Sequence, residues 1–112
     1  AMSWRDFSAL VEQTYLQQGH AVARLNSPVA DFKVVKGGRA TLVSCKRWKS
    51  ANPGVAALRE LVAAKEAAEA QQCAYLSLAP VSATALRFAK AQGVSLLCGD
   101  ALGRFLLAKS RA

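Results

Sequence analysis

One aspartate and one lysine in the first half of the chain have the residue types that phosphodiester hydrolysis needs. Asp31 begins an extended segment, Lys46 lies near the end of the next one, and Ser44 shares a strand face with Lys46. The intervening pair Gly37-Gly38 predicts a hairpin, which would bring Asp31 beside Lys46. A carboxylate can bind a divalent cation that polarises a phosphate and activates water. A neighbouring lysine can stabilise the negative charge that develops. By itself, the spacing is also compatible with a surface ion pair.

The charge distribution adds a candidate binding surface. The net charge is +8, from 15 basic and 7 acidic residues in a chain of 112, and no acidic residue occurs between Asp31 and Glu60. Such a surplus favours polyanions, of which nucleic acid is the first candidate and a membrane surface the alternative. The candidate DNA contacts in this region are Lys33, Lys36, Arg39, Arg47, Trp48 and Lys49. The cations would bind phosphates without base specificity, and Trp48 could stack on a base or pack over the core. A basic segment can also be no more than a solvated face.

The cysteine pattern argues against zinc. Cys45, Cys73 and Cys98 are widely spaced, without a CxxC pair, and His20 is the one histidine. A zinc site needs closely spaced ligand pairs, so no zinc is expected. Buried free thiols and a cytoplasmic location are the prediction. No apolar stretch approaches the roughly 20 residues that cross a membrane, so membrane contact is expected only through a membrane-anchored parent protein.

The hydrophobic periodicity and turn signals predict an α/β fold with the element order αβββαβαβα. Helices are expected over about residues 4–18, 52–71, 82–93 and 101–109, and strands over 20–25, 31–36, 40–48, 73–79 and 94–98. Asn52, Ser82 and Asp100 are the predicted N-caps of the last three helices. A hairpin that enters a sheet completed by helical crossovers implies a mixed central sheet flanked by helices. With no repeat or linker, residues 1–112 are expected to form a single domain, as all or part of a longer protein.

Three stretches resemble the catalytic domain of the Mrr-like type IV restriction endonucleases, a family of the PD-(D/E)XK nuclease superfamily. They are SCKRW at 44–48, VAALRELVAAKEAAEA at 55–70 and YLSLAPVSATALRFAKAQGVSLLCGDALGRFL at 75–106. The resemblance covers about Phe7 to Leu107. It implies a restriction-endonuclease-like fold, DNA as substrate, Mg²⁺ or Mn²⁺ as cofactor without a small-molecule cofactor, and a homodimer for cutting both strands.

The same resemblance assigns the site residues. Asp31 matches the metal-binding aspartate and Lys46 the motif lysine, whereas Ser44 stands where the family usually has Gln or Glu. Ser8 stands where the first helix often has Glu, and Glu12 could substitute for it or be solvated. Two functions therefore stay open. One is a metal-dependent endodeoxyribonuclease with the incomplete set Asp31, Ser44 and Lys46, and the other is a catalytically degenerate module that binds DNA or a protein partner without cutting.

Overall fold

The computed structural model describes residues 4–27, 29–46, 55–77 and 81–107, and the element order is the predicted αβββαβαβα. The helices are α1 (Trp4–Gln17), α2 (Val55–Ala67), α3 (Ala83–Gln92) and α4 (Gly99–Leu107). The strands are β1 (Ala21–Arg24), β2 (Phe32–Lys36), β3 (Arg39–Lys46), β4 (Gln72–Ser77) and β5 (Ser95–Cys98). Within the described ranges, no helix has the length and apolarity that crossing a bilayer requires.

The strands form one five-stranded mixed sheet in the order β1-β2-β3-β4-β5, which confirms the predicted α/β architecture. β1, β2 and β3 pair antiparallel, and β3, β4 and β5 pair parallel. The predicted hairpin joins β2 to β3. Gly37 and Gly38 have φ of 61° and 79° between the register partners Lys36 and Arg39. These positive values explain why glycine occupies both turn positions.

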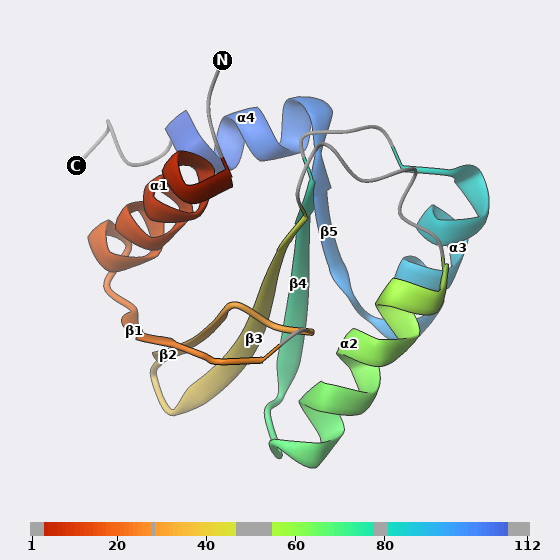
Figure 1. Cartoon of the computed structure of the whole chain (residues 1–112), viewed down its shortest axis with the longest axis horizontal. Coiled ribbons are helices and arrows are strands. Elements are labelled where there is room, and N and C mark those ends of the chain that lie inside the picture. Colours follow the sequence, from red (N-terminus) through yellow and green to blue (C-terminus); the bar gives the residue numbers. More distant parts are fainter. Residues whose placement is uncertain (1–3, 28, 47–54, 78–80, 108–112) are drawn as a thin grey trace.

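Helices cover both faces of the sheet, with α1 and α4 on one side and α2 and α3 on the other (Figure 1). Strand alternation divides the core accordingly. Val43 and Cys45 of β3 pack in the cluster under α1 and α4, whereas Leu42 packs in the cluster under α2 and α3. Each large apolar side chain buried in this way stabilises the fold by about 1.5–3 kcal/mol.

α2 ends at Ala67, four residues before the predicted end at about Gln71. Glu69 adopts a left-handed backbone conformation with φ 56°, and the Gln71 N–H donates to the carbonyl of Ala40 at 3.0 Å. The alanine-rich sequence favours continued helix. The prediction was wrong because backbone pairing with β3 begins at Gln71, so the chain must turn before it.

The predicted caps have different outcomes. The Ser82 hydroxyl accepts a hydrogen bond from the Ala85 N–H at 3.1 Å, which confirms this N-cap. α4 begins at Gly99, so Asp100 lies in the first helical turn rather than at the predicted N-cap position. Its carboxylate still lies near the positive end of the helix dipole. Asn52 lies outside the described residues.

The cysteines are free, as predicted, but they are not all buried. Cys45 and Cys73 are buried, whereas Cys98 is partly exposed. Cys98 ends β5, which is an edge strand of the sheet and has a neighbouring strand on one side only. The apolar run around Cys98 predicted a buried thiol, and this prediction was wrong because an edge strand leaves Cys98 partly exposed.

Candidate active site

Asp31 lies immediately before β2 and is bonded to the residues on both sides of Ser44. Its N–H donates to the carbonyl of Val43 at 2.8 Å, and its carboxylate Oδ2 accepts the N–H of Cys45 at 2.7 Å. The carboxylate thereby takes the place of a strand carbonyl, and β2 begins at the next residue, Phe32. Hydrogen bonds to an ionised acceptor are short and strong. Asp31 is therefore held against the backbone of β3 at Ser44.

Cys45 belongs to the core rather than to the site chemistry. Burial, and after it the negative charge of Asp31, raises the pKa of the Cys45 thiol far above its usual value, and the charge of Arg24 opposes this only in part. A thiol that stays protonated is a poor nucleophile and a poor metal ligand. The candidate reactive side chain described at this end of β3 is therefore Ser44, on the opposite face.

Ser44 projects from the face of β3 that α2 and α3 cover in part. Leu42, two residues earlier, and Tyr75, the register partner of Ser44 on β4, both lie in the core cluster under these helices. Ser44 itself is partly exposed. Lys46 is the last residue of β3 and the register partner of Ser77. The Lys46 side chain lies outside the described residues. The structure therefore brings Asp31 and Ser44 together, and of Lys46 it places only the backbone, at the end of β3.

Lys33 lies on the same face as Ser44. It is the register partner of Leu42, and cross-strand partners in an antiparallel pair project to the same side. It also follows Asp31 by two residues and is partly buried. Of the predicted DNA contacts whose side chains are described, Lys33 is therefore the one beside the candidate site.

Lys36 and Arg39 lie at the other end of the β2–β3 hairpin. Lys36 lies five positions after Asp31, which at about 3.4 Å per residue in an antiparallel strand is roughly 17 Å. The Lys36 ammonium donates a hydrogen bond to the carbonyl of Gln18 at 2.7 Å, at the C-terminal end of α1. Lys36 thus has a structural partner that the sequence did not indicate. The remaining predicted contacts, Arg47, Trp48 and Lys49, lie outside the described residues.

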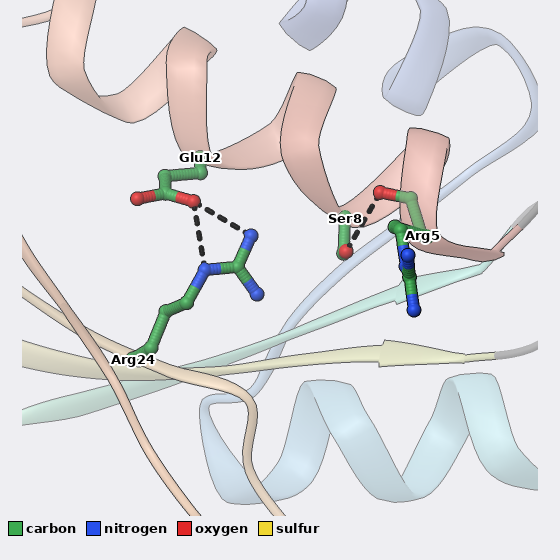
Figure 2. Close-up of polar contacts among 4 residues, drawn as sticks. All are labelled: Arg5, Ser8, Glu12 and Arg24. Carbon is green, nitrogen blue, oxygen red and sulfur yellow. Dashed lines mark hydrogen bonds and ion pairs between the residues drawn. The ribbon is translucent and has the colours of Figure 1, made fainter.

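The α1 residues that could supply a further metal ligand are engaged elsewhere. The buried Ser8 hydroxyl donates to the carbonyl of Arg5 at 3.0 Å. Glu12 Oε1 lies 2.7 Å from Nη2 and 3.0 Å from Nε of Arg24 (Figure 2). The Arg24 guanidinium also lies 5.0 Å from the centre of the Phe32 ring. Glu12 is therefore not simply solvated, because its ion pair with Arg24 joins α1 to β1.

The donor set at Asp31 is small. In residues 4–27, 29–46, 55–77 and 81–107, no group of three or more His, Cys, Asp or Glu side chains is placed to hold a metal ion. Mg²⁺ is often bound by one or two carboxylates together with substrate phosphates. Among the described residues, Asp31 therefore fits a cation that it would share with a phosphate.

One polar side chain beside Ser44 gave no functional signal in the sequence. Tyr75 lies in a segment that reads only as a buried strand, and among the described residues its buried hydroxyl forms no hydrogen bond. The signal that identifies it is the β3–β4 register, which places it opposite Ser44. That register depends on the tertiary pairing of segments about thirty residues apart.

The mixed five-stranded sheet with helices on both faces, and with Asp31 held where β2 begins, is a restriction-endonuclease-like fold, as the comparisons below show. Residues 1–106 match the Mrr_cat family profile, which is described as restriction endonuclease. The chain belongs to this family.

Solved structures support the fold. The protein of unknown function AF1548 has a TM-score of 0.72 and 15% sequence identity, over 91% of this chain and 64% of that one. A repair endonuclease from Pyrococcus abyssi has a TM-score of 0.63 and 15% identity, over 86% of this chain and 46% of that one. The chain thus spans less than two thirds of either protein. A search of curated protein sequences finds no match.

Proposed function

We propose that this chain is the catalytic domain of a metal-dependent DNA endonuclease of the restriction type, which works with the reduced motif Asp31, Ser44 and Lys46. The observation that carries the proposal is the pair of bonds from Asp31 to the residues on both sides of Ser44. Family membership supports nuclease chemistry, and the net charge of +8 supports a polyanionic substrate.

Each residue has a separate role in this proposal. Asp31 would hold Mg²⁺ or Mn²⁺ jointly with a phosphate oxygen of the DNA. When bound, the cation supplies Lewis-acid polarisation of the phosphate and a lower pKa for a bound water. Lys46 orients that water and stabilises the negative charge that develops on the phosphate. Ser44 has a hydroxyl where the family usually has a longer Gln or Glu, so it donates to the phosphate rather than strongly binding the cation.

The test is cleavage of supercoiled plasmid, methylated and unmethylated, in the presence of Mg²⁺ or Mn²⁺. Asp31→Asn and Lys46→Ala are purified identically, and Lys90→Ala on the exposed surface of α3 is the matched control for loss of one positive charge. The proposal expects metal-dependent nicking by the wild type and by Lys90→Ala, but not by the two site variants. Equal cleavage by all four proteins would indicate a contaminating nuclease and reject the proposal.

The alternative is a degenerate domain that binds DNA or a protein partner without cutting it. Two observations favour it: Ser44 lacks a carboxylate, and the described part of the chain holds no three-residue metal-binding group. A binding module would show no metal-dependent cleavage. Its affinity for DNA would fall steeply with salt and would survive Asp31→Asn, because binding then depends on phosphate contacts rather than on the cation.

A further inference from the structure

Two contacts fix the direction in which α1 runs over the β2–β3 hairpin. At the C-terminal end of α1, the Lys36 ammonium donates to the carbonyl of Gln18 at 2.7 Å. Earlier in the helix, Glu12 lies 2.7 Å from Arg24, which is the register partner of Phe32. Phe32 lies four positions farther from the hairpin turn than Lys36. The start of α1 is therefore directed toward the carboxyl end of β3 (Figure 1).

Arg5 is the basic residue at this end of α1, about level with the last residue of β3. It precedes Glu12 by seven positions, which is about 10 Å along a helix. On the sheet, the contact of Glu12 lies above Phe32, and Phe32 is the register partner of Val43. Lys46 follows Val43 by three positions, which is also about 10 Å along a strand. Arg5 thus lies at the end of the sheet that carries the candidate site.

The Arg5 side chain lies where the sheet-facing side of α1 emerges into solvent. Phe7 and Ser8 are buried, and Phe7 packs in the same core cluster as Cys45, near the end of β3. Arg5 is exposed, and Figure 2 shows its side chain on the same side of α1 as Ser8 and Glu12. Among the described residues, the Arg5 guanidinium makes no ion pair or hydrogen bond. Its charge is therefore available to an anion at this end of the sheet.

The position of Arg5 does not serve the stability of α1. It lies in the first helical turn, near the positive end of the helix dipole, where a cation is unfavourable. A guanidinium has the fork of N–H donors that matches phosphate oxygens. On the other face of the sheet, Lys33 lies on the side of Ser44. The candidate site thus has a cation on each face of the sheet, and the Asp31 carboxylate is bonded to the strand backbone between them.

We propose that Arg5 binds a DNA phosphate next to the one that is cleaved, so that the DNA backbone crosses the carboxyl end of β3 from the α1 face to the face of Ser44. The guanidinium holds the phosphate through two N–H donors, and this contact carries no base specificity. The inference rests on the proposed function insofar as nucleic acid binds at this site. It requires binding and not cleavage, so it also applies to a domain that binds DNA without cutting it.

The test measures the affinity of the full chain for a short fluorescein-labelled DNA duplex by anisotropy, across a series of KCl concentrations. The variants are Arg5→Gln and Arg5→Lys, with Arg87→Gln on the exposed surface of α3 as the matched control for loss of one guanidinium. Arg5→Gln should lower the slope of log affinity against log salt concentration by about 0.9 and weaken binding about fivefold at roughly 0.15 M salt. Arg5→Lys, which keeps the charge, should keep the slope. Arg87→Gln should leave both slope and affinity unchanged.

Thermal unfolding separates this role from a structural one. Arg5→Gln should melt at the temperature of the wild type or slightly higher, because it removes a cation from the first turn of α1. Melting several degrees lower would show a structural role and would overturn the inference. Equal salt slopes for Arg5→Gln and Arg87→Gln would also overturn it, as would a slope that Arg5→Lys lowers as much as Arg5→Gln does. A wild type that binds no DNA would instead refute the proposed function, and this inference with it.

Discussion

Lys33 and Lys36 carry the same charge three residues apart on β2, and the structure predicts opposite consequences for their removal. Lys33 lies on the face of Ser44, and among the described residues its ammonium makes no ion pair or hydrogen bond. Lys36 donates to the carbonyl of Gln18 at 2.7 Å. Lys33→Gln should therefore weaken DNA binding without changing stability, and Lys36→Gln should lower stability without a specific effect on binding.

The magnitudes follow from these contacts. Either substitution lowers the net charge from +8 to +7, one cation fewer, so any general electrostatic effect is the same for both. If Lys33 neutralises one phosphate, its loss reduces the slope of log affinity against log salt concentration by about 0.9. A cation at the C-terminal end of a helix contributes about 0.3–1 kcal/mol. For a domain of this size, its loss lowers the melting temperature by a few degrees.

The assay is fluorescence anisotropy with a labelled duplex across a series of KCl concentrations, alongside thermal unfolding of both variants in the same buffer. We expect a smaller salt slope for Lys33→Gln alone and a lower melting temperature for Lys36→Gln alone. Equal changes in salt slope for the two variants would refute it, because the charge would then act through the overall field and not through its place on the sheet.

Three further outcomes are expected. Burial raises the pKa of Tyr75 from an ordinary 10.0 to about 12 in the folded chain. The stability that the protonated phenol contributes is therefore present below pH 10 and is lost as the pH rises toward 12. Urea denaturation at intervals across that range measures this loss, and an unchanged midpoint would contradict it. A double-mutant cycle with Glu12→Gln and Arg24→Ala should give a coupling of about 0.2–1 kcal/mol that decreases with salt; zero coupling at low salt would show that the pair does not tie α1 to β1. Gly38→Ala should destabilise the hairpin by about 1–2 kcal/mol, because Gly38 has a φ of 79°. Gly103→Ala in α4 should be neutral or stabilising, because an added Cβ meets nothing within 4 Å. Chemical denaturation compares the two variants, and a larger loss of stability for Gly103→Ala would contradict this expectation.

Much of the fold was predictable because it depends on short-range signals. The two glycines between β2 and β3 select the hairpin, since their positive φ angles suit the turn. Ser82 marks the start of α3 because its hydroxyl can satisfy a helical N–H within one turn. Alternation assigned Val43 and Cys45 to one face and Ser44 to the other, and this required only the strand period of two.

The position of the candidate site could be predicted from the sequence to within about one residue. A hairpin between Asp31 and Lys46 necessarily returns the end of β3 to the start of β2, and the structure holds Asp31 against the residues flanking Ser44. The roles of Asp31, Ser44 and Lys46 remain predictions for the cleavage assay. The N-cap prediction at Asp100 was wrong by two residues, a typical uncertainty where a helix begins directly after a strand.

By itself, the sequence determined the order of the elements, the hairpin and the side of β3 on which each residue lies, because these follow from periodicity and turn chemistry within a few residues. Only the tertiary structure decided which distant groups meet. It ended α2 before Gln71, whose N–H donates to the carbonyl of Ala40, it engaged Lys36 at the end of α1, and it placed Tyr75 opposite Ser44 in the β3–β4 register. These contacts join segments separated by 18 or more residues, and they depend on how the strands and helices pack, which no local pattern in the chain specifies.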